Sequence, residues 1–265
     1  MLNNTKLSIG VPFYGNVSGE WWTQMLQFVA TLATQLTLGE IITCGTMTAD
    51  HSRNLIVDDF LKSDSEWLFW VDSDTLPPIG AVERMLAVGK TMVSGVYYGK
   101  NPPHPPIAYY KFNGGYRPID QDVRWEKGEI LKVDSAGMGC MLTHRSVFED
   151  IKKNYQVFQQ DGGGLHVVHN NDVLGSIGNT KDGYYSHEHD GKMYKGQLKL
   201  RMNNMTLANP RFPFFMIDHL RTEDIFFFEL AQRVGHSLYL DTSVECGHLR
   251  NVPFTGADYR EEKGH

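Results

Sequence analysis

The stretch Glu66-Trp67-Leu68-Phe69-Trp70-Val71-Asp72-Ser73-Asp74 decides the fold. Five apolar residues run directly into two carboxylates, and Pro77-Pro78 then interrupts the chain. A short, continuous apolar run bounded by turn residues predicts a strand that is buried on both faces, as in the middle of a parallel sheet. Asp72 and Asp74 would then follow the carboxyl end of that strand, which is where open α/β sheets bind ligands. On this stretch alone, an acidic turn that caps the next helix is the alternative.

The flanking sequence alternates between strand and helix patterns. Residues 6–12 and about 40–44 predict two strands before the central one, and residues 91–98 predict a fourth. Helices are expected after Ser18, from about residue 49, and from Pro78. The first of these helices has apolar residues at helical spacing, namely Trp22, Met25, Leu26, Val29, Ala33 and Leu36. This alternation predicts a parallel sheet covered by helices.

The second half of the chain has a different character. Residues 107–112 and 129–133 predict antiparallel strands, and a glycine-rich segment around Gly137 leads into another short strand. Residues 161–195 show no sustained period, so we expect a long loop or a small subdomain there. Thr222 is expected to cap a helix over residues 223–234, followed by strands at about 237–240 and 244–249.

The composition is that of an ordinary soluble globular protein. The 265 residues are 41% hydrophobic and 21% charged, with a formal net charge of -6, which predicts no binding of nucleic acid. The three cysteines are an odd number without metal-ligand spacing, so free thiols in a reducing compartment are expected. The first residues lack the pattern of a secretion signal, and no stretch approaches the length of a membrane span. We therefore expect a cytoplasmic protein, with peripheral attachment to a membrane left open.

The first hundred residues resemble a nucleotide-binding half domain. They contain neither a Gly-x-Gly-x-x-Gly fingerprint nor a Gly-Lys-Ser/Thr loop that would hold phosphates. A nucleotide bound there needs another partner for its phosphates, such as a metal ion or a few placed basic side chains.

Several short motifs occur in a particular order: Ile9-Gly10-Val11-Pro12-Phe13-Tyr14, Arg53-Asn54, Val71-Asp72-Ser73-Asp74, Gly137-Met138-Gly139-Cys140-Met141, Thr222-Glu223-Asp224 and Gly247-His248. In this order they resemble the nucleotide-sugar-dependent glycosyltransferases of the A fold, particularly the family 2-like members. The resemblance spans nearly the whole chain and is weakest over residues 161–195. It implies an α/β, Rossmann-like glycosyltransferase-A fold, with a mostly parallel central sheet flanked by helices and a small antiparallel part.

The resemblance also implies a divalent cation. Sugar transfer releases a nucleoside diphosphate, and a cation acting as a Lewis acid stabilises the charge on the leaving oxygen. Asp74 would be the principal carboxylate ligand, Asp72 would reach the metal or the ribose, and His248 would complete the protein ligands. Such a mixed shell suits Mn²⁺ or Mg²⁺, and the imidazole nitrogen favours Mn²⁺.

By the same resemblance, the donor site lies around the first loop and the central strand. Its expected residues are Pro12, Tyr14, Arg53, Asp72, Ser73, Gly137 and Gly139, with the glycine backbone beside the donor sugar and the acceptor. Arg is well suited to a diphosphate. As alternatives, Tyr14 anchors the loop, and Arg53 is a surface helix residue paired with Asp50 or Asp58.

In inverting members of the family, a carboxylate of the Glu-Asp pair is the general base. The resemblance assigns this role to Asp224, with Glu223 binding acceptor or sugar hydroxyls. The implied substrates are a nucleoside-diphosphate sugar and a hydroxyl acceptor on a glycan, a lipid-linked molecule, a protein or a small molecule.

We expect one domain over residues 1–265, with a nucleotide-binding half (1–100) and an acceptor-binding half (101–265). Three alternatives stay open at this point. They are a retaining transferase on the same fold, a nucleotidyltransferase or phosphohydrolase that uses Asp72 and Asp74, and a non-catalytic carbohydrate-binding module.

Overall fold

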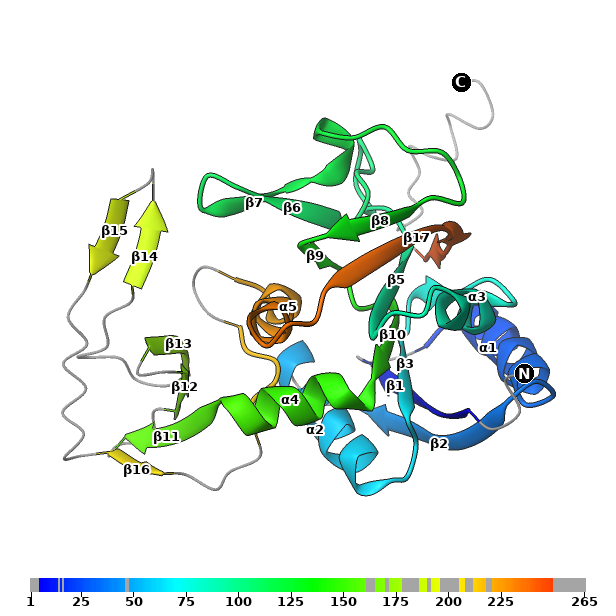
Figure 1. Cartoon of the computed structure of the whole chain (residues 1–265). Coiled ribbons are helices and arrows are strands. Elements are labelled where there is room, and N and C mark those ends of the chain that lie inside the picture. Colours follow the sequence, from blue (N-terminus) through cyan, green and yellow to red (C-terminus); the bar gives the residue numbers. More distant parts are fainter. Residues whose placement is uncertain are drawn as a thin grey trace, which may run out of the picture.

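The computed structural model describes residues 5–13, 15, 17–45, 48–160, 165–169, 172–177, 186–189, 192–195, 205–207, 212–217 and 221–249. At its centre is a seven-stranded sheet with the order β2-β1-β3-β10-β5-β17-β8 (Figure 1). In chain order these strands are β1 (Lys6–Pro12), β2 (Thr37–Cys44), β3 (Trp67–Val71), β5 (Met92–Val96), β8 (Ile130–Val133), β10 (Cys140–His144) and β17 (Leu238–Glu245). The architecture is therefore mixed α/β, as the alternating pattern predicts.

Five of the seven strands run in one direction. Strand β10 is antiparallel to both β3 and β5, and the edge strand β8 is antiparallel to β17. The other neighbouring pairs, β2 with β1, β1 with β3, and β5 with β17, are parallel. The sheet is thus mostly parallel, with one reversed strand at its centre.

Within the described part of the chain, five helices cover the two faces of the sheet: α1 (Gly19–Leu32), α2 (Ala49–Lys62), α3 (Ala81–Ala87), α4 (Arg145–Asn154) and α5 (Glu223–Arg233). Side chains of α1 and α3 pack into one core cluster, and those of α2, α4 and α5 pack into the other. Figure 1 shows the two groups on opposite sides of the central strands. Strand β3 contributes Leu68 and Trp70 to one cluster and Phe69 and Val71 to the other, so its predicted burial on both faces is confirmed.

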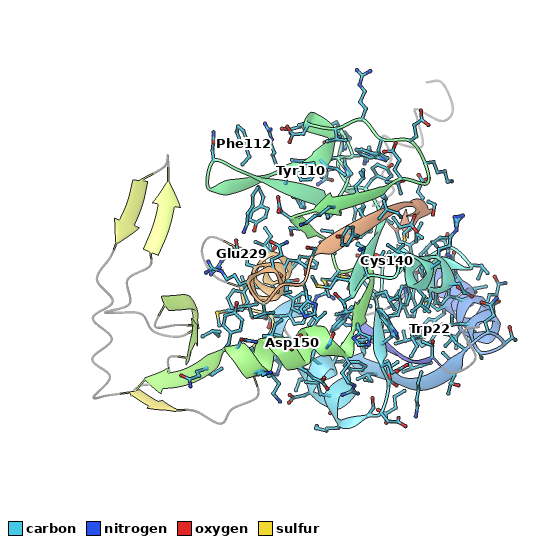
Figure 2. The ribbon with its side chains drawn as sticks, in the orientation of Figure 1. Trp22, Tyr110, Phe112, Cys140, Asp150 and Glu229 are labelled. Atoms are coloured by element: carbon cyan, nitrogen blue, oxygen red, sulfur yellow. The ribbon has the colours of Figure 1, made fainter. Side chains whose placement is uncertain are left out.

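The buried face of helix α1 differs from the face that the sequence pattern predicts. Ser18 caps it as expected, because its side chain accepts a hydrogen bond from the backbone N–H of Trp21. The buried face consists of Trp21, Met25, Phe28 and Leu32. Trp22 and Leu26 are instead 53% and 66% exposed, and Trp22 is labelled on this helix in Figure 2. Both faces carry apolar residues at helical spacing, so periodicity alone did not distinguish them.

Smaller antiparallel sheets surround the central one. They are formed by β6 (Ala108–Phe112), β7 (Gly115–Pro118) and β9 (Ser135–Ala136); by β4 (Thr75–Leu76) and β18 (Gly247–His248); by β11 (Gln156–Gln160), β12 (Leu165–His169), β13 (Asp172–Ile177) and β16 (Met205–Leu207); and by β14 (Ser186–His189) and β15 (Lys192–Lys195). A short 3₁₀ helix, Ile119–Gln121, follows β7. The described parts of residues 161–195 are paired strands.

Hairpin β6–β7 is attached to α5 by a cluster of charged and polar side chains around Glu229, which Figure 2 labels. Glu229 accepts a hydrogen bond from the Tyr116 hydroxyl at 2.8 Å and one from Arg221 at 2.7 Å. Lys111 Nζ lies 3.4 Å from the same carboxylate. Burial acts to raise the pKa of Glu229, but Arg221 and Lys111 outweigh burial, and the pKa is lowered. The ionised carboxylate thus joins the hairpin to the helix that begins with Glu223 and Asp224.

Among the described residues, the structure contains no helix of sufficient length and apolarity to cross a membrane.

Candidate active site

Asp72 follows β3, and its backbone is fixed by three separate elements. Its N–H donates to the carbonyl of Gly139, at the entry to β10. Its carbonyl accepts from the indole N–H of Trp21 on α1 at 2.9 Å and from the backbone N–H of Thr75 at 3.0 Å. The indole of Trp21 thus joins α1 to the turn that follows β3.

Arg53 lies on α2 and connects three carboxylates. Its Nη2 is 3.1 Å and 3.2 Å from the two carboxylate oxygens of Asp72. Its Nε is 3.6 Å from Asp224 Oδ1 and 3.7 Å from Glu223 Oε1. The Arg53 side chain is only 4% exposed. The alternative of a surface arginine paired with Asp50 or Asp58 is therefore wrong.

This cluster contains polar atoms without hydrogen-bond partners. Nε and Nη1 of Arg53 and Oδ1 of Asp224 are all buried, and none of them makes a hydrogen bond in the structure. The guanidinium of Arg53 lies over the ring of Trp70, 5.7 Å from its centroid, which provides a cation–π contact on one side. Buried polar atoms without partners are costly, so their concentration at one place marks a site that a polar ligand would complete.

The charges in the cluster change the pKa values of its members. Burial raises the pKa of Asp224 to about 8; Glu223 and Asp72 raise it too, and Arg53 opposes them. Burial also raises the pKa of Asp72 against the opposing effect of Arg53. Burial disfavours the charged form of Arg53, but Asp72, Asp224 and Glu223 together outweigh burial and raise its pKa. Burial and the two neighbouring carboxylates thus favour the protonated form of Asp224, while Arg53 favours the ionised form.

Asp74 and His248 form a second group beside this cluster. The pairing of β18 with β4 brings His248 opposite Thr75, and the backbone N–H of Leu249 donates to the carbonyl of Asp74 at 2.7 Å. His248 Nε2 lies 3.7 Å from Asp74 Oδ1. Lys100 Nζ lies 2.5 Å from the other oxygen of Asp74.

The environment of His248 suits a metal ligand. Its Nδ1 is 2.8 Å from the carbonyl oxygen of Tyr98, which can only accept, so Nδ1 carries the proton. In the neutral ring, the lone pair is then on Nε2, the atom that faces Asp74. A backbone carbonyl behind a ligating histidine is a usual arrangement in metal sites.

The three predicted metal ligands, Asp72, Asp74 and His248, do not form one group. In the part of the chain that the structure describes, no three His, Cys, Asp or Glu side chains are grouped in a way that could hold a metal ion. Asp74 and His248 come together, whereas the carboxylate of Asp72 faces Arg53. The donor set therefore fits a cation held by one carboxylate and one imidazole, with the remaining ligands supplied by a phosphate-bearing ligand and water.

Gly137 and Gly139 provide space for neighbouring side chains. A Cβ at Gly137 would lie 1.8 Å from the hydroxyl of Tyr97, and a Cβ at Gly139 would lie 2.6 Å from Oγ1 of Thr75 and 3.2 Å from Oδ2 of Asp72. The backbone N–H of Gly139 donates to the Tyr97 hydroxyl at 3.0 Å. Tyr97 thus fills the space over the glycines and fixes the loop that in turn holds Asp72. Contact of these glycines with a donor sugar stays a prediction.

Replacing Gly137 by Ala is expected to lower the free energy of unfolding by about 1–3 kcal/mol, because the new methyl group would overlap Tyr97. Urea unfolding measures this loss. Gly115→Ala is the control, since its Cβ would meet only one atom, at 3.7 Å. The additional loss caused by Gly137→Ala should be smaller in a Tyr97→Phe background, which lacks the overlapping hydroxyl. An unchanged stability of Gly137→Ala would contradict the packing described above.

The structure brings most of the predicted site residues to one edge of the sheet. Arg53, Asp72, Glu223 and Asp224 form one cluster, and Asp74 and His248 lie next to it. Pro12 is buried at the end of β1, and Ser73 lies in the turn after β3. Tyr14 is outside the described residues.

Tyr97 and Lys100 are site residues that the sequence-based reasoning missed. Both follow β5 at its carboxyl end, in a part of the chain that shows no acidic or glycine motif. The rule that ligands bind at the carboxyl ends of parallel strands would have found them if it had been applied to this strand as well as to β3. Tyr109, on β6, is also close: burial raises its pKa, and the charge of Asp224 adds to the effect.

No family model and no curated protein sequence matches the chain. Among solved structures, A197 from STIV has a TM-score of 0.49 with 16% identity, covering 93% of this chain and 86% of that one. GalNAc-T7 with UDP, GalNAc and Mn²⁺ has a TM-score of 0.43 with 10% identity, covering 95% of this chain and 44% of that one.

A third structure is a glycosyltransferase involved in the glycosylation of the major capsid of PBCV-1. Its TM-score is 0.30 with 10% identity, and the match covers 54% of this chain and 61% of that one. All three TM-scores lie below 0.5. The function of this protein is therefore inferred from its site and from the order of its motifs.

Proposed function

We propose that this protein is a glycosyltransferase that moves a sugar from a nucleoside-diphosphate sugar to an acceptor hydroxyl with the help of a divalent cation. The observation that carries the proposal is the position of Arg53. It joins Asp72, after the central strand, to Glu223 and Asp224, which are more distant in the sequence. These are the motifs on which the resemblance to A-fold glycosyltransferases rests, and their meeting at one edge of the sheet is what a shared active site requires.

In this proposal, Asp74 and His248 hold the cation. When bound, the cation supplies a positive charge that stabilises the departing diphosphate. Asp72, fixed by Arg53, would bind the ribose of the donor in this proposal. Nη1 of Arg53, which makes no hydrogen bond within the described residues, is a further donor for oxygen atoms of the substrate.

Asp224 is the proposed general base in an inverting transfer. The acceptor oxygen attacks the anomeric carbon and forms the new C–O bond, while the bond to the phosphate oxygen breaks and its electron pair leaves with the diphosphate. The proton of the acceptor hydroxyl passes to the carboxylate of Asp224. Asp224 is 19% exposed, so the group is accessible to an acceptor although its pKa is raised by burial.

Titration calorimetry with nucleoside diphosphates tests the proposal. In the presence of Mn²⁺, we expect binding of uridine or guanosine diphosphate that disappears when a chelator removes the metal. Asp74→Ala or His248→Ala is expected to weaken this binding by about ten- to a hundredfold, because each removes one of the two protein ligands.

Asp150→Ala is a suitable control for the Asp74 variant. Asp150 is about as exposed as Asp74, at 44% against 42%, and lies on α4 outside the candidate site. If no nucleoside diphosphate binds with or without a divalent cation, the proposed function is wrong. If a nucleoside diphosphate does bind, NMR analysis of the transfer product distinguishes inversion from retention at the anomeric carbon.

A further inference from the structure

Lys100 occupies one oxygen of the carboxylate that is proposed to hold the cation. Its Nζ lies 2.5 Å from Asp74 Oδ2, while His248 Nε2 lies 3.7 Å from Asp74 Oδ1. The carboxylate is therefore shared between an ammonium group on one side and an imidazole on the other. Both partners of the ion pair are partly open to solvent, with Lys100 35% and Asp74 42% exposed.

The backbone around Lys100 is fixed, although its side chain reaches into solvent. The N–H of Gly99 donates to the carbonyl of Pro105 at 2.8 Å, and Tyr98 forms a β-bridge with Pro106. The carbonyl of Tyr98 also accepts the hydrogen bond from His248 Nδ1. The segment that carries Lys100 is thus tied to the proposed metal ligand, and the flexible part is the four-carbon stem of the lysine.

We propose that Lys100 is a positioning residue for the diphosphate of the donor, and that it holds Asp74 only while the site is empty. This inference rests on the proposed function. A divalent cation competes with the ammonium group for Asp74 in the ligand-free protein. When the diphosphate is present, both positive charges face its oxygens, so the ammonium group moves from the carboxylate to a phosphate oxygen.

The exposure of the ion pair makes this exchange inexpensive in free energy. Exposed ion pairs contribute little to stability, because water screens the charges and the side chains lose conformational freedom. A lysine also binds phosphate well as a compact point charge. Lys100 is therefore easily displaced from Asp74 and has a stronger partner available within the same site.

The proposal predicts opposite effects on two ligands when the charge of Lys100 is removed. Lys100→Met keeps most of the stem and removes the ammonium group. The affinity for Mn²⁺ alone should rise about two- to fivefold, because Asp74 loses its competitor. The affinity for a diphosphate in saturating Mn²⁺ should fall about tenfold, because a charged hydrogen-bond donor is lost.

Three probes are used: Mn²⁺ alone, inorganic pyrophosphate with Mn²⁺, and uridine or guanosine diphosphate with Mn²⁺. Calorimetry measures each dissociation constant for the wild type, Lys100→Met, Lys100→Arg and the control Lys62→Met. Lys62 is 69% exposed and paired with Asp59, away from the site. Lys100→Arg should restore diphosphate binding, and Lys62→Met should leave all three constants unchanged.

The outcomes separate this inference from the proposed function. If the wild type binds a nucleoside diphosphate but Lys100→Met changes neither constant, or changes both in the same direction, Lys100 does not have this role. If the wild type binds no nucleoside diphosphate, the proposed function fails. Equal melting temperatures for the lysine variants establish that altered binding does not come from a loss of folding.

Discussion

Replacing Asp224 by Asn is expected to lower kcat by about a hundred- to ten-thousandfold, while the dissociation constant of the nucleoside diphosphate changes by less than about twofold. Asn has nearly the same shape as Asp but cannot accept the proton of the acceptor hydroxyl. Asp224 Oδ1 has no hydrogen-bond partner in the ligand-free protein, so the change to an amide removes a base without breaking a hydrogen bond at that atom. Steady-state kinetics and calorimetry on the same preparation measure the two quantities.

The pH dependence of the rate gives a second readout for the same residue. The pKa of Asp224 is raised to about 8, so the carboxyl group is mostly protonated at pH 6 and mostly ionised above pH 8. A general base works in its ionised form, so kcat/KM of the wild type should rise with pH, reach half its maximum near pH 8 and level off about one pH unit higher. The residual activity of Asp224→Asn should lack this rise.

Glu223→Gln is the matched control for Asp224→Asn. Its carboxylate also lies near Arg53, at 3.7 Å, but its proposed role is to bind hydroxyl groups. We expect an increase in KM with a smaller fall in kcat. If Asp224→Asn retains more than about a tenth of the wild-type kcat, Asp224 is not the general base.

Replacing Arg53 by Met is expected to lower the free energy of unfolding by about 3–5 kcal/mol at pH 8, the largest stability effect that we predict. The variant would leave Asp72, Glu223 and Asp224 close together without the guanidinium that now lies between them. Removing one partner of a buried ionic group is costly because the remaining charges stay unpaired. Urea unfolding measures the loss, and Arg84→Met, at an exposed position of α3, is the control.

The loss in Arg53→Met should become smaller as the pH falls from 8 to 5. Without the guanidinium, the folded-state pKa of Asp72, which burial already raises, rises further above its unfolded value. A carboxyl group with a raised folded pKa binds its proton more tightly in the folded state, so it destabilises the protein as the pH rises through that pKa. Protonation at low pH therefore removes much of the repulsion. A loss that is independent of pH would contradict this account of the cluster.

The sequence predicted the elements more reliably than their partners. The strand from Trp67 to Val71 was recognisable because both of its faces are apolar, and the cap at Ser18 was recognisable from local pattern. The direction of β10 was not, since a short apolar strand has the same pattern whether it runs parallel or antiparallel to its neighbours. Likewise, periodicity could not choose between Trp21 and Trp22 as the buried residue of α1.

The candidate site was predicted in its residue types and only partly in its contacts. Spacing placed Asp72 at the end of a strand, but local candidates for the partner of Arg53 were Asp50 and Asp58. The actual partner, Asp72, is 19 positions away, and its contact depends on how α2 packs against the sheet. Lys100 escaped detection because a single lysine after a strand has no distinctive pattern. Such partners are set by tertiary packing, which a single sequence does not encode in its spacing.

The reversed strand β10 has a consequence for how the chain could be divided. β3 and β5 both come from the first hundred residues, yet each is bonded to β10 rather than to the other. A fragment ending near residue 100 would lack β10, the strand between β3 and β5. The backbone N–H and C=O groups of these two buried strands would then stay unpaired on that side. This N-terminal half is thus a unit of sequence but not an autonomous folding unit. Its recombination with a foreign second half would require that half to supply a strand of matching register.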